Sequence, residues 1–162
     1  MDSEQRQILL ERIGAGLLVV AFAVGAWFLN QYEQARSRDI QRMSRVLETQ
    51  SMFGAYASRY AIFPPAVEGS MLLGVTGADC MSKAGITDRS ADGCKEGFIG
   101  YLSPLGSDGE NAFMAYATFG ADRKSICASQ NGCQWYTIQF EFETNAVASK
   151  GVHIVTPEGF AF

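Results

Sequence analysis

The sequence predicts an α+β fold in which one long N-terminal helix packs on a small antiparallel β-sheet. Three observations lead to this prediction. No proline occurs before Pro64, so nothing breaks a helix over the first sixty residues. Two segments late in the chain alternate between apolar and polar side chains, as half-buried strands do. All four cysteines lie in the distal part, where disulfides can staple loops.

The first half of the expected helix is a membrane segment. Residues 13–29, "IGAGLLVVAFAVGAWFL", carry no charge, and their length is at the short end of what spans a hydrocarbon layer of ~30 Å. A secretory signal peptide and a buried core helix are the alternatives. The mixed charge of "MDSEQRQILLER" and the unbroken helical pattern after the run favour a membrane span. We therefore expect a cytoplasmic arm or leader over residues 1–12 and a transmembrane half over residues 13–30.

Residues 31–63 are expected to continue the same helix as an amphipathic half. Small and apolar side chains recur there at steps of three and four residues, which predicts one sticky side facing the sheet. The members of this row are Ile40, Met43, Leu47, Gln50, Gly54, Ala57 and Ala61, widened by Val46, Phe53 and Tyr60. Arg38, Arg42, Arg45 and Arg59 are expected to lie largely away from this row. The helix should end near Pro64 and Pro65, which remove backbone donors.

Residues 64–162 are expected to form a loop and β-sheet region that completes a globular domain with the helix. We expect loops and short irregular elements over residues 66–111, strands over residues 112–119 and 134–143, and a last short strand in "GVHIVTP". Alternation in the second strand points one row of side chains toward the core and the helix. That row is Tyr136, Ile138, Phe140 and Phe142.

The cysteines favour an oxidising compartment for the distal region. The spacing of Cys80, Cys94, Cys127 and Cys133 lacks the close pairs of common zinc sites, so two disulfides are expected. Neighbours in sequence form the simplest pairing, and two other connectivities remain open. Arginines on both sides of the apolar run instead favour a cytoplasmic distal region by the positive-inside rule. We give the cysteines more weight and expect a single-pass protein of the cytoplasmic membrane with an extracytoplasmic C-terminal domain.

Charge and motifs exclude several function classes. Residues 61–162 hold eleven acids against six lysines and arginines, which speaks against nucleic acid as a partner. The one basic cluster, Arg36, Arg38, Arg42 and Arg45, follows the apolar run and suits a phospholipid headgroup. His153, the only histidine, is expected to be packed or at the surface rather than catalytic. No nucleophile or phosphate-binding motif is present, so we expect neither an enzyme nor a small-molecule substrate.

The order of these segments resembles the type IV pilin and type II secretion pseudopilin superfamily. "RSRDIQRMSRVLETQSMFGAYASRYAIFPP" is similar to the family's segment behind the membrane part, with its proline exit. "SPLGSDGENAFMAYAT" followed by "QWYTIQFEFET" resembles its final loop and paired strands, and "GVHIVTPEGF" resembles a terminal segment. The resemblance implies a structural subunit of a pilus-like filament or a secretion pseudopilus, in contact with copies of itself or with other pilin-like subunits, in the membrane and in an extracellular filament.

Two sets of site residues accompany this resemblance. Self-association is expected through an assembly face in the membrane half, made of Leu17, Leu18, Val20, Phe22 and Val24. Helix–sheet packing is expected to use Ile40, Met43 and Leu47 with Phe53 and the core row of the second strand.

A calcium loop is the one cofactor that we consider. The loop "SDGENA" carries Asp108, Glu110 and Asn111, which are oxygen ligands of the kind calcium takes. A solvated Asp-Gly turn is the commoner outcome for such a loop. The resemblance also implies such a site, because pseudopilins hold calcium in a loop near the final strands. Asp122 would add a ligand.

The sequence departs from the family at its processing motif. Cleavage after Gly14 or Gly16 would place Val19 or Ala21 at the fifth mature position, where prepilins carry glutamate. Two alternatives therefore stay open: a membrane-anchored extracytoplasmic binding or adhesion module that does not polymerise, and a membrane-anchored enzyme of an unrecognised type.

Overall fold

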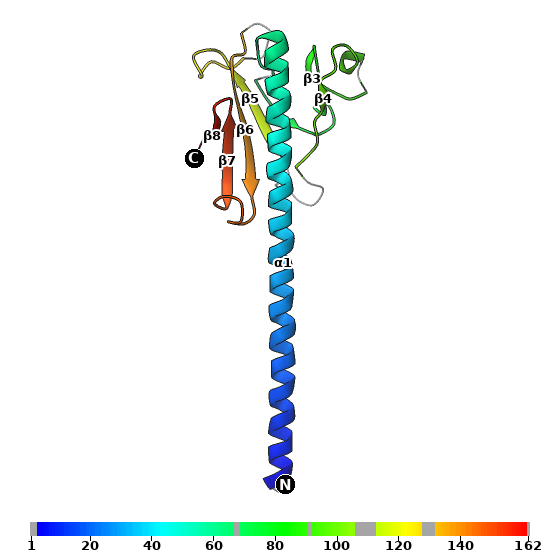
Figure 1. The fold of residues 1–162 in the computed structure, drawn as a ribbon, viewed down its shortest axis with the longest axis vertical. Coiled ribbons are helices and arrows are strands. Elements are labelled where there is room, and N and C mark those ends of the chain that lie inside the picture. The colour runs from blue at the N-terminus through cyan, green and yellow to red at the C-terminus, as the bar shows by residue number, and fades with distance from the viewer. Residues whose placement is uncertain (1–2, 67–68, 91, 106–112, 128–131, 162) are drawn as a thin grey trace.

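A single helix, α1 (Ser3–Tyr60), forms the axis of the molecule, and the rest of the chain gathers around its C-terminal half (Figure 1). The structure is a computed structural model. It describes residues 3–66, 69–90, 92–105, 113–127 and 132–161, with the side chains of residues 3–11 and 93 left aside. The prediction of one long N-terminal helix packed on antiparallel strands is confirmed.

The helix ends through a left-handed residue. Ala61 has a φ of 61°, and its backbone N–H donates to the carbonyl of Ala57 at 2.8 Å, which satisfies one of the last helical carbonyls. Pro64 and Pro65 follow and cannot continue the helix. The chain is thereby turned back toward the strands at the end of the helix that is distant from the N-terminus (Figure 1).

A five-stranded antiparallel sheet covers one side of the helix. Its order is β1-β5-β6-β7-β8, with every neighbouring pair antiparallel. The strands are β1 (Ser70–Leu73), β5 (Met114–Phe119), β6 (Trp135–Phe142), β7 (Gly151–Thr156) and β8 (Gly159–Ala161). The alternating segments seen in the sequence are thus β5 and β6, and the last predicted strand is β7.

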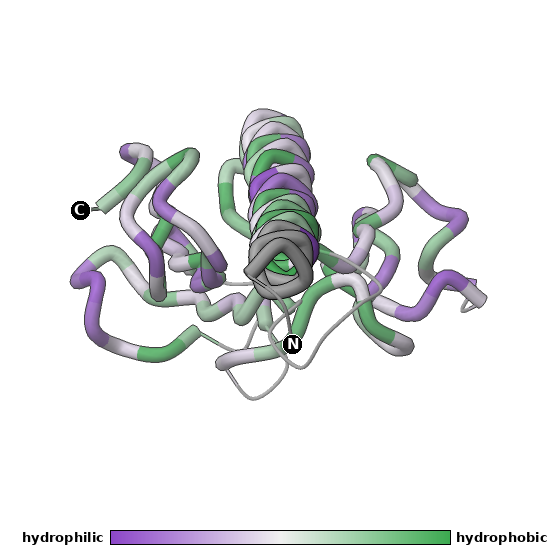
Figure 2. The backbone as a smooth tube through the Cα atoms, turned by 90° about the horizontal axis from the view of Figure 1, so that it is seen from below, coloured by the Kyte–Doolittle hydropathy of each residue, from purple (hydrophilic) through white to green (hydrophobic). Residues whose placement is uncertain are grey.

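A second, smaller sheet lies on the other side of the helix (Figures 1 and 2). Its order is β3-β2-β4, built from β2 (Cys80–Ser82), β3 (Gly85–Thr87) and β4 (Gly100–Tyr101). The short 3₁₀ turn η2 (Asp92–Cys94) completes this lobe. Residues 66–111 were expected to hold only short irregular elements, and the described part of that region instead contributes β1 and this three-stranded sheet.

Each of the two sheets has one disulfide within or beside it. Cys80 pairs with Cys94 inside the smaller lobe, and Cys127 pairs with Cys133 beside the start of β6. This is the simplest of the three possible connectivities. In the chain-entropy model a closed loop of about fifteen residues, like the first, stabilises by roughly 3 kcal/mol.

The core lies between the helix and the inner face of the larger sheet. Phe53 is fully buried, and its ring centroid lies 4.6 Å from that of Tyr116 and 5.1 Å from that of Tyr136. Burial raises the pKa of Tyr136 to about 12, against the effect of a hydrogen bond with Gln50. The inner row of β6, which is Tyr136, Ile138, Phe140 and Phe142, is buried in the same cluster.

Candidate functional site

The N-terminal half of α1 stands free of the domain. Every described side chain from residue 12 to residue 34 is exposed, including Phe22 at 78%. The helix is long and apolar enough to cross a membrane, and none of its most apolar window is buried against the chain. Such a surface is unfavourable in water, so this segment needs lipid or a protein partner. Disulfides in the domain are consistent with an extracytoplasmic location for it.

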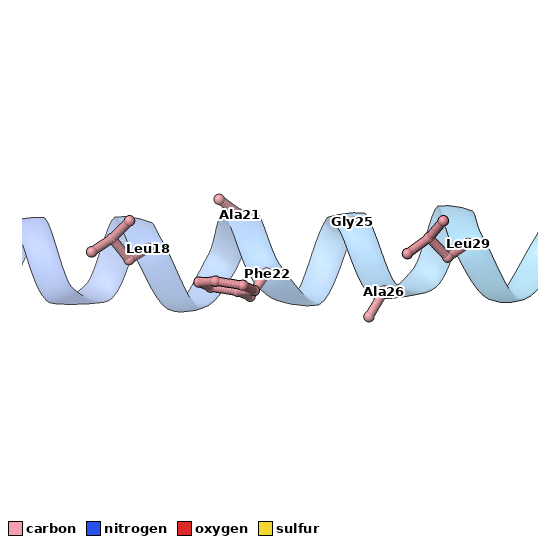
Figure 3. A pocket seen from close by; sticks show the side chains of 6 residues that line it. All are labelled: Leu18, Ala21, Phe22, Gly25, Ala26 and Leu29. Atoms are coloured by element: carbon pink, nitrogen blue, oxygen red, sulfur yellow. The ribbon is translucent and has the colours of Figure 1, made fainter.

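An open groove of about 370 Å³ runs along one side of this apolar half (Figure 3). Gly25 lies between larger neighbours, and a Cβ atom built on it would meet nothing within 4 Å. The groove is lined by Leu18, Ala21, Phe22, Gly25, Ala26 and Leu29. Grooves floored by small residues let two membrane helices approach closely.

The predicted assembly face is only partly this groove. Leu17, Leu18, Val20, Phe22 and Val24 are all exposed, at 48% or more. At about 100° per residue, however, these five side chains do not share one side of a helix. Leu18 and Phe22 line the groove, whereas Leu17, Val20 and Val24 do not. The prediction grouped these five residues because they are apolar. The period of the helix places them on different sides.

The sheet-facing side of the C-terminal half of α1 differs from the predicted side. Ile40 and Leu47 were expected to pack on the sheet, and they are instead 52% and 49% exposed. The buried positions are Asp39, Arg42, Val46, Thr49, Phe53 and Tyr56. Met43 is partly buried at the edge of this face. The prediction was wrong for Ile40 and Leu47 and is confirmed for Phe53. The buried face begins with two charged residues, which a count of apolar side chains assigns to solvent.

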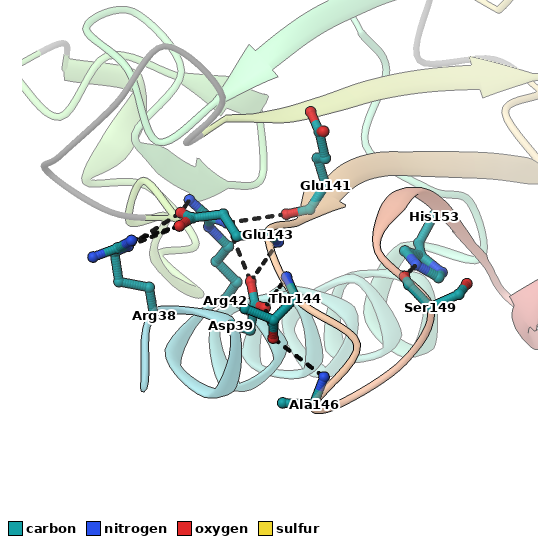
Figure 4. A network of polar contacts seen from close by, with 9 residues as sticks. All are labelled: Arg38, Asp39, Arg42, Glu141, Glu143, Thr144, Ala146, Ser149 and His153. Atoms are coloured by element: carbon teal, nitrogen blue, oxygen red, sulfur yellow. Dashed lines mark hydrogen bonds and ion pairs between the residues drawn. The ribbon is translucent and has the colours of Figure 1, made fainter. Parts of the chain in front are cut away.

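Asp39 holds the end of β6 against the helix (Figure 4). Its carboxylate is fully buried and accepts hydrogen bonds from the backbone N–H of Glu143 at 2.9 Å and of Thr144 at 2.8 Å. The Thr144 hydroxyl donates a third, at 2.7 Å. The guanidinium of Arg42, which is also buried, lies 3.2 Å from the same carboxylate. The network thereby pairs a buried charge and satisfies it with hydrogen bonds.

Glu143 completes the network from the strand side. Arg38 contacts its carboxylate at 2.5 Å, and Arg42 forms a second ion pair with it. The hydrogen bond from Arg38 lowers the pKa of Glu143, and nearby positive charge adds to this effect while burial opposes it. Arg42 was expected on the solvent side of the helix and is instead in this buried network.

The basic cluster is therefore largely engaged within the chain. Arg38 and Arg42 bind Glu143, Arg36 lies 3.7 Å from Glu33, and Arg45 lies 3.1 Å from Glu48. Arg38 and Arg42 were expected to bind a phospholipid headgroup, and in the structure they bind a carboxylate of the same chain. Sequence reasoning missed this pairing because about a hundred residues separate the partners.

The calcium loop stays a prediction, because most of its expected ligands lie outside the described residues. Asp108, Glu110 and Asn111 lie outside the part that the structure describes. The carboxylate of Asp122 accepts from the backbone N–H groups of Lys124 and Ser125 and pairs with the Ser125 hydroxyl, which lowers its pKa. Within the described ranges no three metal-binding His, Cys, Asp or Glu side chains come together.

His153 is a buried residue of β7 in the larger sheet. Its Nε2 lies 2.6 Å from the carbonyl oxygen of Ser149, and its ring centroid lies 5.0 Å from that of Phe142. Figure 4 shows it apart from the Asp39 network. The ring thus packs within the domain and fixes the loop before β7.

Comparison with known proteins adds no assignment. The chain matches no protein-family model, no curated protein and no solved structure.

Proposed function

We propose that this chain is a structural subunit of a pilus-like filament or secretion pseudopilus, and that it self-associates through its N-terminal apolar helix. One observation carries the proposal. The helix α1 runs without interruption from an exposed apolar half into the core of a disulfide-bonded domain. A domain mounted on such a helix can be stored in a membrane and later packed against copies of itself.

The physical basis is that the apolar surface of this helix can be buried both in lipid and in a bundle of like helices. In lipid, the apolar half is solvated by acyl chains and its backbone hydrogen bonds are made within the helix. In a bundle of like helices, the same side chains are buried by van der Waals packing, with Ala21 and Gly25 permitting close approach. The proposed location follows: a single pass through the cytoplasmic membrane, an extracytoplasmic domain, and assembly into an extracellular filament.

A second function is a membrane-anchored extracytoplasmic binding or adhesion module that does not polymerise. The observation that favours it is the absence of any acid between Ile13 and Leu29. A buried acid in such a segment would specify the register between subunits, because it needs a partner in an apolar medium.

A pair of matched variants separates the two functions. Ala21 lines the groove and Ala23 does not, and both are exposed. Cells that express the wild type, Ala21→Leu or Ala23→Leu are sheared, released filaments are pelleted, and the intact mass of the protein in the pellet is measured. Short pseudopili are captured in parallel by amine cross-linking of intact cells.

We expect the wild type and Ala23→Leu in the pellet or in a cross-linked ladder. Ala21→Leu should be reduced about tenfold, equivalent to roughly 1.4 kcal/mol, because the larger side chain fills the groove. A wild-type protein that stays in the membrane and forms neither filament nor ladder would refute the filament proposal and support the anchored module.

A further inference from the structure

One side of α1 is covered by neither sheet and carries its own pattern. In Figure 2 the helix lies between the two sheets with one side uncovered. Ile40 and Leu47 project there at about half exposure, whereas Val46 and Phe53, about 100° to 140° away around the helix, are fully buried. Two exposed large apolar side chains seven residues apart lie about two turns apart on one helix side.

This pattern continues without a break into the membrane half. From Leu18 onward, exposed residues at steps of three and four define one row, which we call the free stripe. The free stripe consists of Leu18, Phe22, Gly25, Leu29, Glu33, Arg36, Ile40, Ser44, Leu47, Ser51, Gly54 and Ser58. Eleven steps cover forty residues, about 3.6 per step, so the row stays on one side of a straight helix.

The free stripe suits a copy of itself. Large side chains at Leu18, Phe22 and Leu29 alternate with Gly25, and Ile40 and Leu47 alternate with serines and Gly54. In a parallel two-fold pair each position lies at the height of its own copy, so Gly25 and Gly54 face their equivalents and let the two helices approach closely there. Copies inserted into one membrane from the same side point the same way, so the pair is parallel.

The two charges on the free stripe are arranged for this partner. Glu33 and Arg36 lie 3.7 Å apart and about 60° apart around the helix, on opposite flanks of the row. In a parallel pair related by a two-fold axis along the helices, Glu33 of one copy lies on the same flank as Arg36 of the other. Two such pairings form in each dimer, and no like charges meet.

We propose that the free stripe is a parallel homodimer interface that extends from the membrane along the solvated helix. The partner is a second copy of this chain. The inference rests on the proposed function, since it takes residues 13–30 to be inserted in a membrane, and it adds that the pair forms before and without any filament.

Single added cysteines test this interface, because both native disulfides leave the chain with no free thiol. Ser44→Cys and Ser51→Cys place a thiol on the free stripe. Gln34→Cys and Arg45→Cys are matched controls, exposed on the same helix but turned about 80° to 180° away from the stripe members. Each full-length variant is purified and reconstituted into phosphatidylcholine vesicles, where no assembly machinery is present, and is oxidised with copper phenanthroline.

We expect the stripe variants to form disulfide-linked dimers at least about tenfold faster than the controls. Adding Ile40→Glu and Leu47→Glu to Ser51→Cys should lower this rate about tenfold, the effect of roughly 1.4 kcal/mol. Both positions are exposed, so the domain folds, which retention of the two native disulfides by mass verifies.

Two results would overturn the interface. One is equal cross-linking of the stripe variants and the controls. The other is no more cross-linking of the stripe variants than in vesicles that hold a tenfold lower density of protein. This result is independent of the filament assay. Stripe-specific dimers from a chain that is never found in filaments would refute the proposed filament role and leave the interface standing.

Discussion

Asp39 is the residue on which the helix and the larger sheet depend most. It lies on the helix in sequence and at the end of β6 in space, where it binds two backbone N–H groups and one hydroxyl. A buried carboxylate is costly to desolvate, and only a full set of partners offsets that cost. Its position therefore fixes the axial position of α1 relative to the larger sheet.

Removing Asp39 should destabilise the domain strongly. Asp39→Ala leaves two N–H groups unpaired and the buried Arg42 with less negative charge nearby, so we expect a loss of about 3–5 kcal/mol. Urea unfolding of the full chain in detergent, followed by tryptophan fluorescence, measures it. Asp92→Ala is the control, because its partner Lys95 and its own side chain are solvent-exposed. Similar stabilities for the two variants would contradict the role given to Asp39.

Glu143 makes the stability of the domain dependent on pH. Its pKa is lowered in the folded state, chiefly by the hydrogen bond with Arg38. Its contribution is therefore present above the unfolded value of about 4.3 and is lost as pH falls through the lower folded value. Between about pH 5 and pH 3 the free energy of unfolding should fall less steeply in Glu143→Gln than in the wild type. Glu48→Gln, which removes a half-exposed partner of Arg45, should keep the wild-type slope.

At the scale of the element, the strands were easier to predict than the helix face. In β6 the side chains alternate strictly, and Tyr136 and Ile138 are buried as the period of two requires. On α1 the apolar pattern is ambiguous, because Ile40 and Leu47 stand outside while Asp39 and Arg42 stand inside. The burial of Asp39 and Arg42 is favourable only because Glu143 and Thr144 bind them. These partners are distant in sequence, so no local pattern reveals the pairing.

The two sides of the helix should respond differently to truncation. Phe53→Ala removes a fully buried ring that contacts Tyr116 and Tyr136, so we expect a cost of about 3–5 kcal/mol. Leu47→Ala, at an exposed position, should change stability by less than about 0.5 kcal/mol. The same urea titration compares them. A loss in Leu47→Ala as large as that in Phe53→Ala would restore the sequence prediction that Leu47 packs on the sheet.

For the whole molecule, sequence reasoning reached the architecture but not its second sheet. The long helix and the strands β5, β6 and β7 followed from proline placement and alternation. The strands β2, β3 and β4 are two or three residues long, and β3 and β4 begin with Gly85 and Gly100. Segments this short carry no periodic signal, so tertiary pairing and the Cys80–Cys94 disulfide define them.

The state of the cysteines tests the placement of the domain as a whole. Whole cells are treated with N-ethylmaleimide before lysis, and the intact mass of the protein is measured. A second sample is reduced in denaturant and treated with N-ethylmaleimide again before its mass is measured. We expect no added maleimide before reduction and four after reduction in denaturant, because every cysteine is in a disulfide. Maleimide adducts on the unreduced protein would place the domain in a reducing compartment.

The unbroken course of α1 has a mechanical consequence. A helix of 58 residues without proline behaves as a stiff rod of about 87 Å, at 1.5 Å per residue. Torque applied at one end of such a rod reaches the other end, because no hinge absorbs it. A rotation of the apolar end about its own axis therefore turns both sheets with it. In the proposed membrane location, the direction in which the domain points would be set by the apolar end of the helix.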